Sequence, residues 1–131
     1  MIMIPSKLKS EEKYFMQIVK AYSRKRMRGM PTRRYFFRVR VWPDKNDLSQ
    51  FCDVQEVFYN FGESAKKLVK FVEGATSYEF DINDADVEFT VGAVFKGYIH
   101  QEIKYGTYGP DKFYNVEVIK HCGYCDIEGG K

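Results

Sequence analysis

The sequence is poor in the residues on which disulfide frameworks and membrane anchors depend. Its 131 residues include only three cysteines, and an odd, small number indicates a reducing compartment rather than a disulfide framework. No apolar run approaches the roughly 20 residues of a membrane-spanning helix, and residues 1–10 lack the apolar centre of a signal peptide. We therefore expect one cytoplasmic domain over residues 1–131, without a membrane partner.

Common catalytic motifs are also missing. The chain has no glycine-rich phosphate loop, no HExxH zinc motif and no GxSxG nucleophile turn. With only two histidines, it also has no arrangement of Ser, His and Asp along the sequence that indicates a catalytic triad. Glu102 near His100 indicates a surface ion pair rather than an acid/base dyad. We expect no enzymatic activity.

Potential metal ligands gather near the C-terminal end, at His121, Cys122 and Cys125. The CGYC pair follows a predicted strand, whereas a redox pair needs a helix N-terminus to stabilise its thiolate. With His121 or Cys52, the pair is a weak zinc candidate, and two free thiols are the preferred interpretation. We therefore expect no cofactor.

Charge is distributed unevenly along the chain. Residues 1–40 carry twelve Lys and Arg against two Glu, whereas residues 41–131 carry nine against sixteen acidic residues. No acid lies between Glu12 and Asp44. This polarity indicates either a polyanion bound on one side or a basic segment that docks on its own acidic body.

The end of the basic segment alternates as a strand should. Over residues 35–42 one predicted face is apolar, with Tyr35, Phe37, Val39 and Val41. The other carries Phe36, Arg38, Arg40 and Trp42. Aromatic rings beside cations are what a single-stranded nucleic-acid site requires, and the alternative is a solvated edge strand.

Two helices are predicted from 3.6-residue periodicity. Ser10 as N-cap and an apolar stripe predict a basic helix over residues 10–28, the stripe being Tyr14, Phe15, Ile18, Val19 and Tyr22. The second helix follows residues 61–64 and ends at Gly74. Its predicted buried face is Ala65, Leu68, Val69 and Val72.

Further strands are predicted on both sides of the second helix. A strand over residues 51–59 needs a bulge to place Val54 and Val57 on one face. Residues 76–88 form an acidic connector, in which Ala85 interrupts the ligand spacing of a calcium loop. A long strand over residues 89–105, bent at Gly92 and Gly97, returns over residues 113–120, and residues 121–131 are a peripheral tail.

This order predicts a mostly β protein with flanking helices. We expect an OB-like five-stranded antiparallel barrel over residues 33–120 plus an N-terminal helix. The alternative is an α+β antiparallel sheet with both helices on one face.

Residues 84–121 resemble the C-terminal hairpin of phage-encoded OB-fold single-stranded-DNA-binding proteins. The shared pattern is an acidic lead-in, a glycine, a strand, a Tyr-Gly-rich turn and a tyrosine on the return strand. Here these are Asp84 and Asp86, Gly92, residues 95–104, residues 105–109, and Tyr114. The resemblance implies a role in phage replication or recombination, in the host cytoplasm.

The sequence therefore predicts binding of single-stranded DNA or RNA with weak sequence preference. The predicted binding residues are Arg24, Lys25, Arg26, Arg28, Arg33, Arg34, Phe36, Arg38, Arg40, Trp42, Lys96, Tyr98, Lys104, Tyr105 and Tyr108. The alternative function is a small phage-type interaction module that inhibits a host or phage replication or nuclease protein, as an anti-CRISPR protein or a DNA mimic does. In that case residues 73–88 would imitate phosphates.

Overall fold

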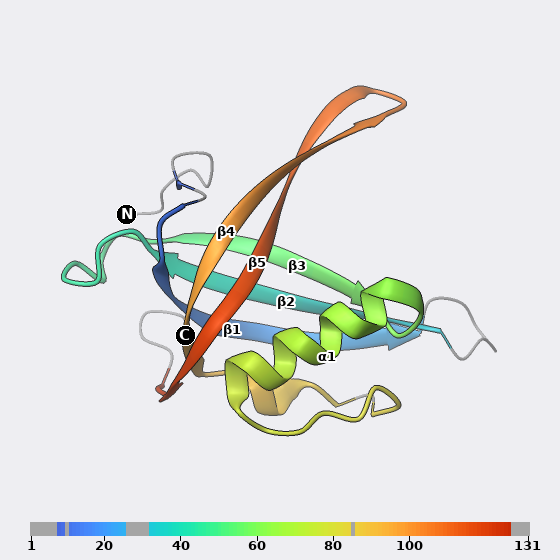
Figure 1. Ribbon diagram of the computed structural model, residues 1–131, viewed down its shortest axis with the longest axis horizontal. Coiled ribbons are helices and arrows are strands. Elements are labelled where there is room, and N and C mark those ends of the chain that lie inside the picture. The colour runs from blue at the N-terminus through green and yellow to red at the C-terminus, as the bar shows by residue number, and fades with distance from the viewer. Residues whose placement is uncertain (1–7, 10, 26–31, 85, 127–131) are drawn as a thin grey trace.

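The protein is mostly β, with one α-helix packed against a five-stranded antiparallel sheet (Figure 1). The computed structural model describes residues 8–9, 11–25, 32–84 and 86–126. The elements are β1 (Tyr14–Lys25), β2 (Arg33–Trp42), β3 (Cys52–Tyr59), α1 (Gly62–Thr76), the 3-10 helix η2 (Glu88–Thr90), β4 (Ala93–Gly106) and β5 (Gly109–Tyr124). The strand order is β3-β2-β1-β4-β5. Within the described residues, no helix is long and apolar enough to span a membrane.

The first element is a strand, so the helix predicted over residues 10–28 is wrong, and Ser10 lies outside the described residues. The pairing of β1 with β2 shifts between Ile18 and Lys20, which leaves Val19 as an extra, bulged residue. The bulge moves the buried positions from even numbers to the odd-numbered Ala21. Buried residues at positions 14, 18 and 21 imitate the spacing of a helix.

Phe71 of α1 lies at the centre of the core. Its ring centroid is 4.9 Å from that of Phe37 on β2, 5.3 Å from Phe58 on β3 and 6.0 Å from Phe95 on β4. One helical side chain therefore contacts three strands, and it holds α1 against the sheet.

The predicted second helix is present, with longer bounds. Leu68 and Val72 are buried as predicted, whereas Ala65 and Val69 are half-buried. The helix continues past Gly74 and ends where Ser77 adopts a left-handed φ of 64° and donates its N–H to the Glu73 carbonyl at 2.9 Å.

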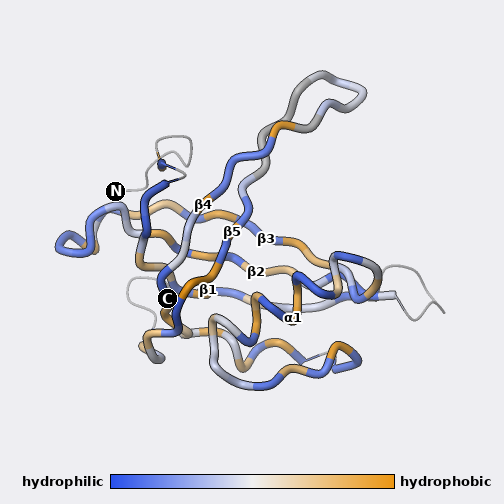
Figure 2. The backbone as a smooth tube through the Cα atoms, viewed as in Figure 1, coloured by the Kyte–Doolittle hydropathy of each residue, from blue (hydrophilic) through white to orange (hydrophobic). Residues whose placement is uncertain are grey.

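Strand β2 has the predicted apolar core face, and Figure 2 shows hydrophilic and hydrophobic residues alternating along it. The predicted bulge in β3 is wrong. Cys52, Val54 and Phe58 point inward in regular alternation, and the fourth inward residue is Glu56, only 5% exposed. A charged residue on the core face interrupts the apolar pattern, although the backbone is regular.

The hydrogen-bonded sheet is open, with β3 as one edge strand and β5 as the other. A side chain links these two edges across the core, because the Glu56 carboxylate accepts the backbone N–H of Val116 on β5. The α-helix follows the third strand, so the predicted N-terminal position for a flanking helix is wrong.

Strands β4 and β5 form a long hairpin whose outer end projects beyond the body (Figure 1). The pairing shifts after Val94 and after Lys96 leave Cys122 and Ile119 of β5 as the extra residues. Gly92, with a φ of 96°, lies before β4, so the bends predicted within this strand at Gly92 and Gly97 are not confirmed. Strand β5 continues to Tyr124, and the Cys125 N–H donates to the Gly92 carbonyl at 3.0 Å. Residues 121–125 therefore belong to the body, and the prediction of a peripheral tail is wrong for them.

Candidate nucleic-acid interface

The outward faces of β1 and β2 carry cations and aromatic rings in alternating rows. Pairing places Arg24 beside Arg34 and Lys20 beside Arg38. Between these two basic rows, Tyr22 lies beside Phe36. We call this surface the basic–aromatic face, and it consists of Lys20, Tyr22, Arg24, Arg34, Phe36 and Arg38.

The central rings of this face are engaged with each other and with the cations. The centroids of Tyr22 and Phe36 are 4.8 Å apart, with 16° between the ring planes. The Arg24 guanidinium carbon is 5.3 Å from the Tyr22 centroid, and that of Arg34 is 5.6 Å from the Phe36 centroid. Phe36 is half-buried, with its ring against Tyr22 and near the Arg34 guanidinium, and its predicted role in stacking bases stays a prediction.

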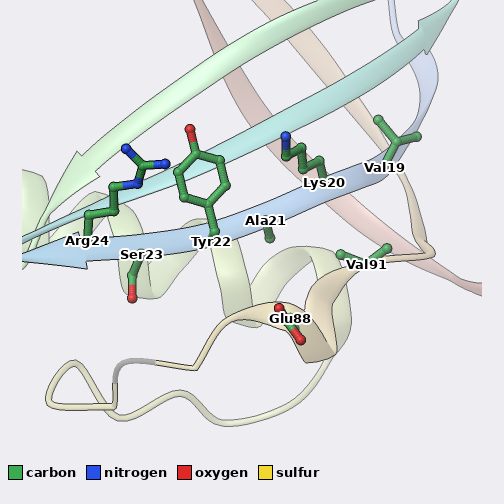
Figure 3. A pocket seen from close by; sticks show the side chains of 8 residues that line it. All are labelled: Val19, Lys20, Ala21, Tyr22, Ser23, Arg24, Glu88 and Val91. Atoms are coloured by element: carbon green, nitrogen blue, oxygen red, sulfur yellow. The ribbon is translucent and has the colours of Figure 1, made fainter.

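Lys20 joins the same cluster. Its Nζ lies 5.5 Å from the Tyr22 centroid, and Figure 3 shows Lys20, Tyr22 and Arg24 on one side of β1, with Ser23 on the other. These residues border an open cavity of about 670 Å³ that extends toward Glu88 and Val91.

The cations of the basic–aromatic face retain their hydrogen-bonding capacity. In the part of the chain that the structure describes, none of its four basic side chains forms an ion pair with a carboxylate. The Nε of Arg34 is buried without a hydrogen-bond partner there. Lys20, Arg24 and Arg38 are exposed. An external anion would therefore meet donors that are already ordered and are not neutralised by described residues.

Arg40 differs from its neighbour Arg38. Its Nε donates to Asp53 Oδ1 at 3.0 Å and its Nη2 to Oδ2 at 3.3 Å, and its side chain is 12% exposed. Its guanidinium carbon also lies 4.0 Å from the Phe51 centroid. The predicted role of Arg40 as a groove-lining cation is not supported, because Asp53 neutralises it.

Four of the predicted residues lie at the two ends of the molecule, away from the basic–aromatic face. Trp42 and Lys96 lie at the far end of the sheet, where the Trp42 Nε1–H donates to the Leu48 carbonyl at 3.2 Å and the Lys96 Nζ is 4.9 Å from the Phe15 centroid. Tyr105 and Tyr108 are 83% and 102% exposed at the hairpin tip.

Strand positions account for the rest of the predicted set. Lys25 and Arg33 pair with each other at the end of the basic–aromatic face. Tyr98 is half-buried on β4, with its ring centroid 6.1 Å from that of His100. The side chain of Lys104, like Arg26 and Arg28, lies outside the described residues.

Sequence reasoning missed Lys20, Tyr22, Phe15 and Phe51. The predicted N-terminal helix assigned Phe15 and Tyr22 to a buried stripe, whereas both are half-buried on the outer side of a strand. The signal that could have found them is the alternation of Lys20, Tyr22 and Arg24, which repeats the order of the basic and aromatic residues on β2.

Among the described residues, no group of three or more His, Cys, Asp and Glu side chains is arranged to hold a metal ion. Cys122 and Cys125 are exposed, whereas Cys52 is buried, and burial raises the pKa of its thiol to about 11. His121 Nδ1 lies 2.6 Å from the Ala75 carbonyl oxygen. Cys52 therefore lies in the core, whereas Cys122 and Cys125 lie at the surface.

The acidic connector uses its carboxylates locally. The Oδ1 atoms of Asp81, Asp84 and Asp86 each accept the backbone N–H two residues later, at 2.9, 3.0 and 2.9 Å. Such turns give these acids a local structural role in the connector.

Comparison of the chain with protein-family models, with curated proteins and with solved structures finds no match in any of the three.

Proposed function

We propose that this protein binds single-stranded nucleic acid, DNA or RNA, with weak sequence preference, and that it acts by binding rather than by catalysis. The observation that most supports this is the stack of Arg24, Tyr22, Phe36 and Arg34 across two strands. Guanidinium groups held on aromatic rings have lost part of their conformational freedom before a phosphate arrives. Phosphate contacts of this kind carry affinity without reading sequence.

We further propose that the sheet is an OB-type barrel. Supporting features are the helix between the third and fourth strands, the pairing of β1 with β4, and the Glu56 link between the β3 and β5 edges. OB domains bind oligonucleotides on the face of strands 2 and 3 and with the β1–β2 and β4–β5 loops. In this chain the β4–β5 turn carries the exposed Tyr105 and Tyr108. The process proposed from the hairpin resemblance is phage replication or recombination.

The test is fluorescence anisotropy of an end-labelled oligonucleotide of about 20 nucleotides at several salt concentrations, with the matching duplex as a control. The association constant should fall linearly with salt on a logarithmic plot, with a slope of about −0.7 for each phosphate contact on a single strand. Preference for duplex, or no binding at low salt, would contradict the proposal. No anisotropy change at low salt would favour the alternative function, an inhibitory protein-interaction module.

Arg38→Ala locates the binding surface. Arg38 is exposed and, in the described residues, not ion-paired, so its loss should weaken binding and reduce the slope by about 0.7. The matched control is Lys70→Ala, which removes an exposed cation from α1, away from the basic–aromatic face. Equal losses of slope in both variants would show that total charge, rather than this face, determines binding.

A further inference from the structure

Two cavities meet beside Trp42 at the end of the sheet next to the β2–β3 connection. The first has a volume of about 450 Å³. Its apolar lining residues are Phe15, Trp42, Leu48, Phe51 and Val94, and its polar lining includes Gln17, Arg40, Lys45, Asn46 and one acid, Asp126. The second, of about 340 Å³, is lined by Lys13, Lys45 and Lys96 together with one acid, Asp44. Phe15, Trp42, Lys45 and Asn46 line both cavities, so the apolar space opens directly beside the basic one.

The walls of the apolar cavity are fixed by contacts within the protein. Asp53 and the ring of Phe51 hold the Arg40 guanidinium, and the Leu48 carbonyl holds the Trp42 indole. Behind them, Gln17 Nε2 donates to the carbonyl oxygens of Gly92 and Cys125, at 3.3 and 2.9 Å. A cavity with preformed walls can bind a ligand with little loss of conformational entropy in its lining side chains.

The two linings together select a ligand chemistry. Aromatic walls and an ion-paired guanidinium favour a flat, apolar group, and the neighbouring lysines favour an anion joined to that group at short range. A nucleotide has this construction, since its base is planar and its phosphate is anionic. The apolar cavity also falls within the range of about 300–1,000 Å³ that is usual for small-ligand pockets.

The position of the cavities fits a strand that crosses the basic–aromatic face. Arg38 and Arg40 are consecutive outward residues of β2, about 7 Å apart along the strand, and Trp42 is the next one. We propose that the paired cavities bind one nucleotide of the single strand, with its base between Phe51 and Trp42 and its phosphate beside Lys45 and Lys96. This inference rests on the proposed function and gives it a base-binding subsite.

Trp42 is the only tryptophan in the chain, so its fluorescence reports on this subsite alone. The experiment compares oligothymidylate of about 20 nucleotides with a sugar–phosphate strand of the same length that lacks bases. Anisotropy measures binding to the protein as a whole, and Trp42 emission measures entry of a base. We expect both strands to bind and only the base-bearing strand to quench Trp42.

The outcomes separate the two proposals. No anisotropy change with either strand contradicts the proposed function itself. Binding of oligothymidylate without quenching, or equal quenching by the strand that lacks bases, overturns the subsite and leaves the function standing. Free thymidine monophosphate that quenches as tightly as the oligonucleotide would assign the cavities to a free nucleotide, and it would also overturn the inference.

Two variants test the walls. Phe51→Ala should weaken binding of oligothymidylate by about tenfold, the loss expected when one stacked base is released, and leave binding of the base-free strand unchanged. Leu48→Ala should act in the same direction without risk to the fold, because Leu48 is 54% exposed and its carbonyl, which holds Trp42, is retained. The matched control is Phe61→Ala, which removes an exposed ring outside the cavities. Equal losses on both strands would overturn the assignment.

Discussion

Replacing Glu56 by glutamine tests how strongly the buried carboxylate of β3 makes the stability of this protein depend on pH. Glu56 is 5% exposed and accepts the Val116 N–H from the opposite edge of the sheet. Burial raises its pKa from an ordinary value of 4.5 to about 7, while the Val116 hydrogen bond and the charge of Lys67 act in the opposite direction. The group is therefore largely protonated in the folded protein at pH 5 to 6.

The sign of the effect follows from proton binding. The folded state binds this proton more tightly than the unfolded chain, so its contribution to stability is complete below about pH 4.5 and is lost as the pH rises through about 7. The full difference between the two pKa values corresponds to about 3 kcal/mol. Between pH 5 and pH 8, integration of the linkage relation gives a loss of about 2.5 kcal/mol.

Glu56→Gln keeps a carbonyl oxygen for the Val116 N–H and removes the titration. Urea unfolding followed by far-UV circular dichroism should show that the stability of the variant, relative to the wild type, improves by about 2.5 kcal/mol from pH 5 to pH 8. Glu63→Gln is the control, because it removes a carboxylate at the exposed start of α1 and leaves the buried Glu56 in place, so it should not reproduce this change. Parallel profiles for Glu56→Gln and the wild type would refute the reasoning.

Three further changes test packing and charge. A Cβ on Gly97 would lie 2.5 Å from the Glu117 carbonyl oxygen, so Gly97→Ala should lower the free energy of unfolding in urea by about 1–3 kcal/mol. Gly106→Ala is the control, because a Cβ there would have no atom within 4 Å, and it should match the wild type. Equal losses of stability in the two variants would contradict the close approach at Gly97. Phe71→Ala should cost about 3–5 kcal/mol in the same assay, and a cost under 1 kcal/mol would mean that α1 does not depend on this ring. Arg40→Ala should lower the melting temperature without changing the salt slope of oligonucleotide binding, because the Arg40 guanidinium is already ion-paired with Asp53. A reduced slope would show instead that Arg40 contacts a phosphate.

The elements that could be predicted from the sequence are those with an uninterrupted period. Every second residue from Tyr35 to Val41 is apolar, and the structure confirms these residues as the core face of β2. The β4–β5 hairpin was also predictable, because a Tyr-Gly-rich turn separates its two strands and Val116 and Val118 face inward on the return strand. Strong alternation is a local signal that tertiary contacts rarely reverse.

The errors have physical causes that lie outside any local window. A single bulged residue, Val19, gives β1 the spacing of a helix. The buried Glu56 breaks the apolar period of β3 because its carboxylate is satisfied by Val116, 60 residues away. Phe71 was missing from the predicted helix face, although it contacts three strands.

Only part of the candidate site could be predicted from the sequence. Its cations follow from the charge run, so Arg24, Arg34 and Arg38 could be named from composition and alternation alone. The stack of Tyr22 on Phe36 could not, because it requires the register of two strands. Nor could the neutralisation of Arg40, whose partner Asp53 comes opposite it only through the pairing of β2 with β3.

The length of the β4–β5 hairpin has a consequence for local opening. In the described residues, β1 pairs with β4 only over Val94–Gly97, so β5 is the sole ladder partner of β4 from Tyr98 to the turn. A two-stranded ribbon in water is marginally stable by itself. Ile99 is buried and pairs with Val116, whose N–H donates to Glu56, so the independent ribbon begins beyond this pair. Amide hydrogens between Gln101 and the turn should therefore exchange with solvent through opening of the ribbon, while those of β2 exchange only when the whole domain unfolds. The two exposed tyrosines at the tip are thus carried on a segment that can melt and re-form independently of the core.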